Sequence, residues 1–170
     1  MDEIAIRNVF YVLRPTFHAP FIIPVLRLIE FLGRGQAKSS SRYSARVSAE
    51  EAFQGENGRY WASGWNDPER KIWFQFEEAH TLAQIGFSSR SGGHLSKTPA
   101  HFLVIGSTLT ENCKKWSTLL EVKNAGFTTD NEFKSWLIPA VKRKPFHCIG
   151  FKIVSTISPL AELTNITMWD

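Results

Sequence analysis

The sequence has few of the features that mark catalytic or disulfide-rich proteins. Its two cysteines, Cys113 and Cys148, are too few for a disulfide scaffold. The five histidines and two cysteines show no zinc-ligand spacing. There is no glycine-rich phosphate loop and no nucleophile elbow, and the carboxylates are scattered without a marked pair. These absences predict a protein that is not an enzyme.

Long apolar segments and a strong charge imbalance are also missing. The longest nearly uncharged run, residues 15–26, is too short to span a bilayer, so no transmembrane segment is predicted. The first residues lack a basic region, and Arg14 and Pro20 interrupt the apolar residues that follow, so no secretory signal is evident and a cytoplasmic location is expected. The net charge of +4 permits an acidic partner. No nucleic-acid-binding signature occurs, so nucleic acid is not an expected partner.

Aromatic residues and turn residues are abundant by contrast. Thirteen phenylalanines and six tryptophans suit a sandwich with a thick aromatic core. Apolar segments of strand length follow one another with Gly, Pro, Asn and Asp between them, and no long helical pattern separates them, which predicts an antiparallel β-sandwich. Both cysteines lie in or near these segments, which favours buried free thiols over a bridge. The predicted strands are 71–76, 83–88, 101–106, 116–122, 133–138, 146–155 and 163–169, with possible short edges at 43–47 and 59–62.

Residues 1–42 differ from the rest, because they carry six basic and three acidic side chains. Residues 4–13 fit a strand or a helix, residues 24–32 predict a short amphipathic helix, and residues 33–44 predict an exposed connector. The helix would either pack on the sandwich or dock on a membrane surface or a protein partner. A capping box from Ser48 to Glu51 predicts one helical turn.

A series of short motifs then occurs in a fixed order: Ala52-Phe-Gln-Gly55, Trp61-Ala-Ser-Gly-Trp65, Ile72-Trp-Phe-Gln-Phe76, Ile85-Gly-Phe87, Phe146-x-Cys-Ile-Gly-Phe-Lys-Ile153 and Ile166-Thr-Met-Trp169. This order resembles the discoidin domains, also called coagulation factor 5/8 C-type domains, of the galactose-binding-like superfamily. The resemblance covers residues 43–170 and implies an all-β, eight-stranded antiparallel jelly-roll β-sandwich, with residues 1–42 as a short N-terminal extension. Family members bind sugars, anionic phospholipid or proteins through loops at one end.

The resemblance also implies positions for a ligand. Galactose-binding relatives carry Trp-His-Ser/Thr-x-Trp and, after the strand that contains Ile-Gly, an arginine; the matching residues here are Trp61, Ser63, Trp65 and Arg90. Ala62 replaces the histidine that would bind a sugar hydroxyl, which argues against galactose specifically. Gln54 replaces an aspartate of the family, and a neutral amide is a poorer ligand for a hard cation. No cofactor is predicted, and a structural calcium ion stays open.

Three loops of such a sandwich, residues 54–59, 64–70 and 88–98, are expected at one end. The predicted ligand-binding residues on them are Trp65, Asn66, Asp67, Arg90, His94 and Lys97. A guanidinium offers a planar fork for diols or acidic groups, and an exposed indole offers a platform for a sugar face. The structural alternative places Trp61 and Trp65 in the core and pairs Arg90 with a carboxylate such as Asp67. For Trp61 this alternative is preferred.

Two functions follow from these patterns. The first is a non-catalytic module that recognises a carbohydrate or an anionic headgroup through the loops, which Trp65 and Arg90 favour. The second is a protein–protein interaction module of an intracellular assembly, with the N-terminal segment or a face of the sandwich as the contact. Ala62 and the missing secretory signal favour this second function.

Overall fold

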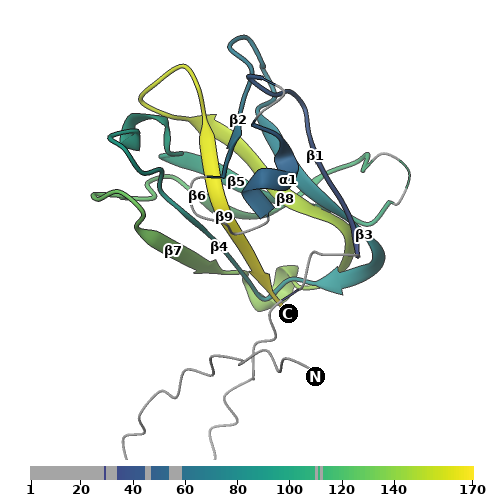
Figure 1. The fold of residues 1–170 in the computed structure, drawn as a ribbon. Helices are drawn as coiled ribbons and strands as arrows, with labels where there is room; N and C mark the ends of the chain where they lie inside the picture. The colour runs from purple at the N-terminus through teal and green to yellow at the C-terminus, as the bar shows by residue number, and fades with distance from the viewer. Residues whose placement is uncertain (1–28, 30–33, 45–46, 54–58, 110, 112) are drawn as a thin grey trace, which may run out of the picture.

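Two antiparallel sheets form the molecule in the computed structural model (Figure 1). The structure describes residues 29, 34–44, 47–53, 59–109, 111 and 113–170. The first sheet has the order β1 (Gly35–Ser39), β3 (Lys71–Thr81), β8 (Pro145–Ser155), β5 (His101–Ser107) and β6 (Ser117–Val122). The second has the order β2 (Trp61–Ala62), β9 (Glu162–Trp169), β4 (Gln84–Ser88) and β7 (Phe133–Leu137). The short helices are α1 (Ala49–Phe53), η1 (Leu95–Lys97) and η2 (Ala140–Lys142).

The predicted β-sandwich is therefore confirmed, and each of its seven principal strands is present. Alternation explains why: in β3, the core residues Ile72, Phe74 and Phe76 are spaced two apart, so they lie on one face of the strand. Of the two short edges, residues 59–62 contribute β2, whereas Tyr43 and Ser44 form no strand. The described residues contain nine strands rather than eight.

The additional strand, β1, corrects the prediction of an exposed connector at residues 33–44. Gly35–Ser39 pairs with Phe76–Ile72 along the edge of the first sheet. Ala37 is its buried residue, and the Lys38 side chain donates to Oε1 of Gln75 at 2.7 Å. An edge strand needs little apolar character, and an edge lysine suits it. These residues belong to the sandwich although the sequence placed them in the extension.

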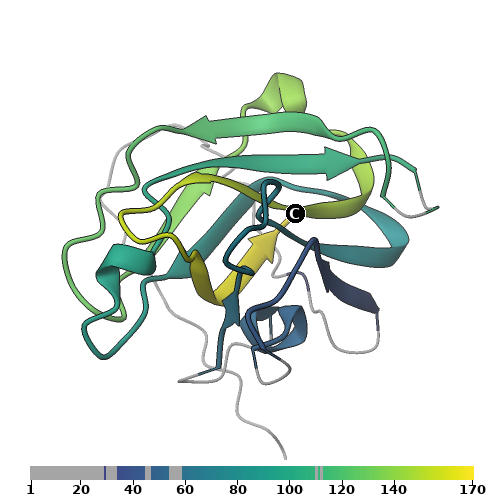
Figure 2. The ribbon, with the colours of Figure 1, turned by 90° about the horizontal axis from the view of Figure 1, so that it is seen from above.

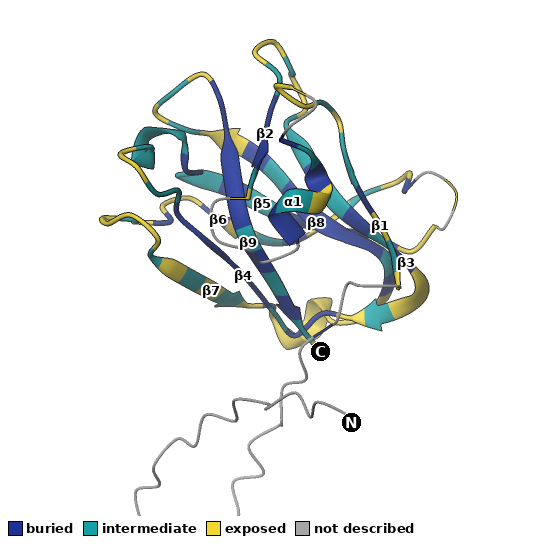
Figure 3. Ribbon diagram, viewed as in Figure 1, coloured by how far each residue is buried: buried dark blue, intermediate teal, exposed yellow. Residues whose placement is uncertain are grey.

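Aromatic rings fill the space between the sheets. Phe87 of β4 meets Phe102 of β5 and Phe151 of β8 at centroid distances of 5.3 and 5.4 Å, both in edge-to-face geometry. Trp136 of β7 packs on the same group. Figure 3 shows the buried residues concentrated along β9, β4 and β8. Such ring pairs contribute about 0.5–1.5 kcal/mol each beyond the area that they bury.

Helix α1 follows Ser48 as the capping box predicts, and its Ala52 and Phe53 side chains are buried in the core. The predicted elements at residues 4–13 and 24–32 lie outside the described residues, except for Ile29. That residue is buried, and its N–H donates to the Met168 carbonyl at 2.9 Å. Among the described residues, no helix has the length and apolar character needed to cross a bilayer.

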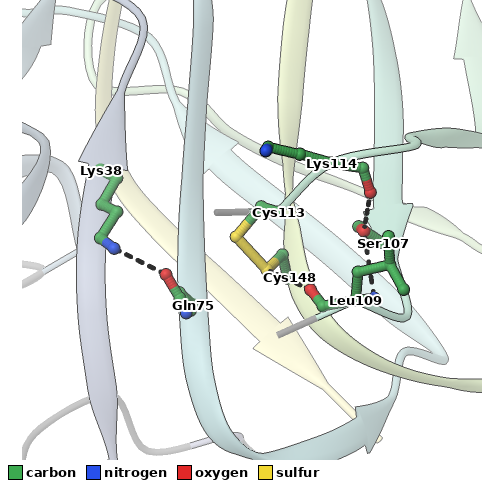
Figure 4. Close-up of a disulfide and its surroundings, with 7 residues drawn as sticks. All are labelled: Lys38, Gln75, Ser107, Leu109, Cys113, Lys114 and Cys148. Atoms are coloured by element: carbon green, nitrogen blue, oxygen red, sulfur yellow. Dashed lines mark hydrogen bonds between the residues drawn. A yellow bond between two sulfur atoms is a disulfide. The ribbon is translucent and has the colours of Figure 1, made fainter. Parts of the chain in front are cut away.

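The cysteines form a disulfide, which corrects the prediction of two free thiols (Figure 4). Cys148 lies on β8 directly before the core residue Ile149, and successive residues of a strand face opposite ways, so its side chain points to the outer face of the sheet. Cys113 comes from the loop between β5 and β6, and its Cα lies 5.8 Å from that of Cys148. The sequence placed both residues near strands, but it did not show that this loop returns across β8.

Candidate functional site

Two of the three loops that the sequence singled out, residues 64–70 and 88–98, lie at one end of the sandwich, together with the segment that follows β1. This end is uppermost in Figure 1 and faces the viewer in Figure 2. Residues 54–58 of the third loop lie outside the described residues. Three main-chain hydrogen bonds join the segments: Tyr43 to Ala62 and Ser63 to Ala161, both at 2.9 Å, and Ser158 to Ser96 at 2.8 Å. The loop end is therefore one connected surface that includes residues 40–44, 63–70, 89–100 and 156–161.

Two exposed aromatic rings lie on this surface. The Trp65 residue is 56% exposed and Tyr43 is 51% exposed. Their ring centroids are 6.1 Å apart with the planes tilted by 59°. We call these two residues the aromatic platform. The preferred reading of Trp61 as a core residue is confirmed, since it is fully buried and its Nε1–H donates to the Ser41 carbonyl.

Asp67 holds the loop that carries Trp65. Its Oδ2 accepts from the hydroxyls of Ser40 and Ser41, and its Oδ1 accepts from the N–H of Glu69. Burial alone would raise the pKa of this carboxyl, but the hydrogen bonds from Ser40, Ser41, Glu69 and Arg70 outweigh it, and the pKa lies below 3.8. Oδ2 thus joins the loop to the segment that follows β1, and Oδ1 closes a turn within the loop, so Asp67 positions Trp65.

Arg90 forms an ion pair with Glu162, a residue that the sequence interpretation did not select. The Arg90 Nε lies 3.0 Å from Oε2 of Glu162, and Nζ of Lys97 lies 3.0 Å from Oε1. The side chains of Arg90 and Glu162 are 11% and 4% exposed. The guanidinium also lies over the Tyr60 ring, 3.6 Å from its centroid. The structural alternative was thus correct about a carboxylate partner and wrong in choosing Asp67.

The remaining predicted residues lie beside these two groups. Asn66 is exposed next to Trp65. His94 is half-buried and precedes η1, after Gly92 and Gly93, whose φ angles of 76° only glycine adopts readily. The structure therefore places Trp65, Asn66 and Asp67 in one group, and Arg90 and Lys97 in a second around Glu162. The register of β2 and β9 connects the groups, because Ala62 lies opposite Glu162.

No cluster of three or more His, Cys, Asp or Glu side chains suited to a metal ion occurs among the described residues. Gln54, the position at which the sequence left a calcium ion open, lies outside them. The chemistry of the described loop end is therefore that of aromatic rings, hydroxyls and a buried carboxylate shared by two cations.

No protein-family model and no curated protein sequence matches the chain. Solved structures do match it. A chitosan-binding module from a chitosanase/glucanase of Paenibacillus sp. IK-5 is similar with a TM-score of 0.66 at 14% identity, covering 81% of this chain and 96% of that one. The chain has the galactose-binding-like fold. This is the fold that the discoidin resemblance implies.

Two further neighbours from Clostridium perfringens were determined with sugars. The family 32 carbohydrate-binding module of NanJ, in complex with galactose, is similar with a TM-score of 0.63 at 13% identity, covering 79% of this chain and 93% of that one. The module CpGH89CBM32-5, in complex with GalNAc-β-1,3-galactose, is similar with a TM-score of 0.64 at 12% identity, covering 78% and 93%. At these identities the similarity establishes the fold.

Proposed function

We propose that the chain is a non-catalytic carbohydrate-binding module that holds a sugar ring on the aromatic platform. The observation that carries this proposal is the pair of half-exposed rings, Tyr43 and Trp65, at the loop end of this fold. Aromatic faces left in water are favourable contact surfaces for the C–H face of a sugar. Asp67 fixes the loop beside Trp65, so the indole loses little freedom when a ligand binds.

The charged group beside the platform favours a carbohydrate over an anionic headgroup. Sugar hydroxyls both donate and accept hydrogen bonds, and Lys97, whose side chain is the most exposed of the Arg90, Lys97 and Glu162 cluster, can donate to one of them. Glu162 already offsets one of the two positive charges, which weakens the attraction for a free anion. The structural neighbours that bind chitosan or galactose support the same class of ligand.

The test is a glycan array probed with the wild-type protein and with the variants Trp65→Ala and Tyr43→Ala. We expect binding to a defined group of glycans, and a loss of roughly tenfold or more in affinity for each variant. Thermal stability should stay near that of the wild type, because both rings are exposed. Val141→Ser is the matched control, since Val141 is 92% exposed and belongs to η2, the short light-green helix at the lower end of the sandwich in Figure 1. An array without any signal would refute the proposal.

A second candidate, a protein-interaction module, is favoured by the outer face of the four-stranded sheet. Phe133 and Leu137 of β7 are exposed on one face, and the Phe133 ring meets Trp169 at 6.2 Å. If the array is silent and one protein is recovered whose binding Leu137→Ser abolishes, this second function replaces the first.

A further inference from the structure

One Asn-x-Ser/Thr sequence occurs in the chain, Asn165-Ile166-Thr167. This is the acceptor signal for N-linked glycosylation, which modifies asparagines at the surface of secreted proteins. The signal lies in β9, an interior strand of the four-stranded sheet. A short motif alone predicts little, so the surroundings of Asn165 decide whether it can carry a sugar.

Asn165 lies at a β-bulge. Where β4 advances from Gly86 to Ser88, β9 advances from Thr167 to Thr164 and therefore contains one extra residue. The φ of Asn165 is 50°, in the left-handed region that asparagine enters more readily than most residues do. A bulge redirects a side chain out of the regular ladder, so Asn165 is not held as an ordinary strand residue.

The Asn165 amide lies on the outer face of the sheet. Phe87 packs in the core, so the next residue, Ser88, faces outward, and Nδ2 of Asn165 donates to its Oγ at 3.1 Å. The Asn165 residue is half-buried, and an amide has a second hydrogen to give up. In the transfer, Nδ2 bonds to C1 of the sugar and loses that hydrogen as a proton, while the lipid diphosphate that carried the sugar leaves. The remaining N–H still donates to Ser88.

Thr167 has a feature that packing does not explain. Its Oγ1 is buried and has no hydrogen-bond partner among the described residues. A buried hydroxyl without a partner costs free energy, and valine has nearly the same branched shape without the hydroxyl. The acceptor signal, in contrast, requires a hydroxyl at this position. Glycosylation therefore accounts for a threonine that the fold alone does not need.

An exposed aromatic ring lies beside the site. Phe133 is 42% exposed, and its Cζ would lie 2.6 Å from a Cβ built on Gly86, so the ring covers Gly86. Gly86 is paired with Thr167, which places the ring next to the acceptor signal. The face of an aromatic ring is a favourable contact for a sugar, so the first units of a glycan on Asn165 would cover a ring that is otherwise left in water.

The disulfide between Cys113 and Cys148 agrees with this modification. Disulfides persist in oxidising compartments, and these include the lumen of the endoplasmic reticulum, where the acceptor signal is read.

We propose that Asn165 carries an N-linked glycan, which covers the outer face of the four-stranded sheet beside Phe133. The glycan leaves the aromatic platform free, because that platform lies at the loop end. The proposal does not depend on the carbohydrate-binding function, and it opposes the cytoplasmic location expected from the sequence.

The test is mass spectrometry of the full chain secreted by human cells behind an added secretion signal. We expect one N-linked glycan, which peptide N-glycosidase removes to leave an aspartate at position 165. Asn165→Gln and Thr167→Val should each abolish the glycan, whereas Thr167→Ser keeps the acceptor signal and should retain it. Asn131→Gln is the matched control and should retain the glycan, because Asn131 also has a left-handed φ, 57°, but belongs to no acceptor signal.

Urea unfolding of bacterially produced, unglycosylated protein shows that the variants fold. Thr167→Val should be at least as stable as the wild type there, because it removes a buried hydroxyl that has no partner among the described residues. Secreted, disulfide-bonded wild type without a glycan overturns the proposal, and so does a glycan that persists in Thr167→Val. Protein from its native source should carry the glycan on the same peptide, and an unmodified Asn165 there overturns the proposal as well.

Discussion

The carboxylate of Glu162 lies 3.0 Å from Nε of Arg90, with 4% and 11% of the two side chains exposed. This pair joins the first residue of β9 to the loop that leaves β4, which are 72 residues apart in sequence. Lys97 occupies the other carboxylate oxygen at 3.0 Å. One buried carboxylate therefore fixes two points of the 89–100 loop, and in this way Glu162 stabilises the loop end.

Glu162→Gln should destabilise the protein strongly. An uncharged amide removes the negative charge that pairs with Arg90 in a site that water scarcely reaches, and breaking such an ion pair costs about 3–5 kcal/mol. Because Lys97 is partly exposed and retains some solvation, we expect a decrease at the lower end, about 3 kcal/mol, in the free energy of unfolding measured with urea. Glu121→Gln, which removes a more exposed carboxylate paired with His101, should cost less than about 1 kcal/mol. Equal effects of the two substitutions would contradict a structural role for the Glu162 pair.

Asp67→Asn should reduce stability in a pH-dependent way. The pKa of Asp67 is lowered in the folded protein, so its contribution to stability is present above pH 3.8 and is lost as the pH falls through the folded pKa. The difference between wild type and variant should thus be largest near neutral pH and shrink toward pH 2. Urea unfolding at several pH values measures this difference. The pKa of Glu132 is also lowered, chiefly by the N–H of Thr128, so acid sensitivity will persist in the variant. A difference that is constant with pH would exclude the proposed role of the Asp67 charge.

The strands with strong alternation could be predicted from the sequence, and β1 could not. In β3, every second residue from Ile72 to Phe76 is apolar and buried, which is a local signal. In β1 only Ala37 is buried, and the strand forms because β3 provides an open edge next to it. Pairing with a distant edge leaves no periodic trace in a five-residue segment rich in Gly, Ser and Lys.

In the candidate site, too, some residues could be predicted from the sequence and others could not. Trp65 could be selected as a candidate because it lies in a turn with Asn66 and Asp67, but the sequence left a core position open for it. Tyr43 could not be identified, because a hydrogen bond from its N–H to the Ala62 carbonyl brings it to Trp65. Glu162 was missed for a related reason: a carboxylate at the start of a strand is ordinarily solvated, and its two partners lie far away in sequence.

The disulfide between Cys113 and Cys148 should contribute about 4 kcal/mol, since it closes a loop of 35 residues in the unfolded chain. Urea unfolding with and without a reducing agent measures this contribution. The double variant Cys113→Ser, Cys148→Ser should resemble the reduced protein and should not respond to the reducing agent. A wild type that is equally stable in both conditions would show that the bridge contributes nothing to the free energy of unfolding.

The same bridge tests the location expected from the sequence. Disulfides persist in oxidising compartments, and the cytoplasm keeps thiols reduced. We expect alkylation and mass spectrometry of protein from its native source to find both cysteines blocked. Recovery of two free thiols would instead agree with a cytoplasmic location.

Gly150→Ala should destabilise the five-stranded sheet strongly. Gly150 of β8 lies opposite Trp73 of β3, and a Cβ there would approach the Ile72 carbonyl oxygen to 2.1 Å and the Trp73 Cα to 2.5 Å. Both are backbone atoms of a paired strand, so relief requires β3 and β8 to separate, and we expect a loss of about 3 kcal/mol in unfolding free energy.

Gly93→Ala is the matched control for Gly150→Ala. A Cβ at Gly93 would meet no atom within 4 Å, but its φ of 76° lies in the left-handed region. This variant therefore measures backbone strain without a clash, and it should cost about 1–2 kcal/mol. Gly150 has no such φ, so its variant measures the clash alone. If Gly93→Ala proves the more damaging variant, the close approach of β3 and β8 does not limit the stability of the sandwich. The packing of Trp73 over Gly150 would then not be what excludes a side chain at position 150.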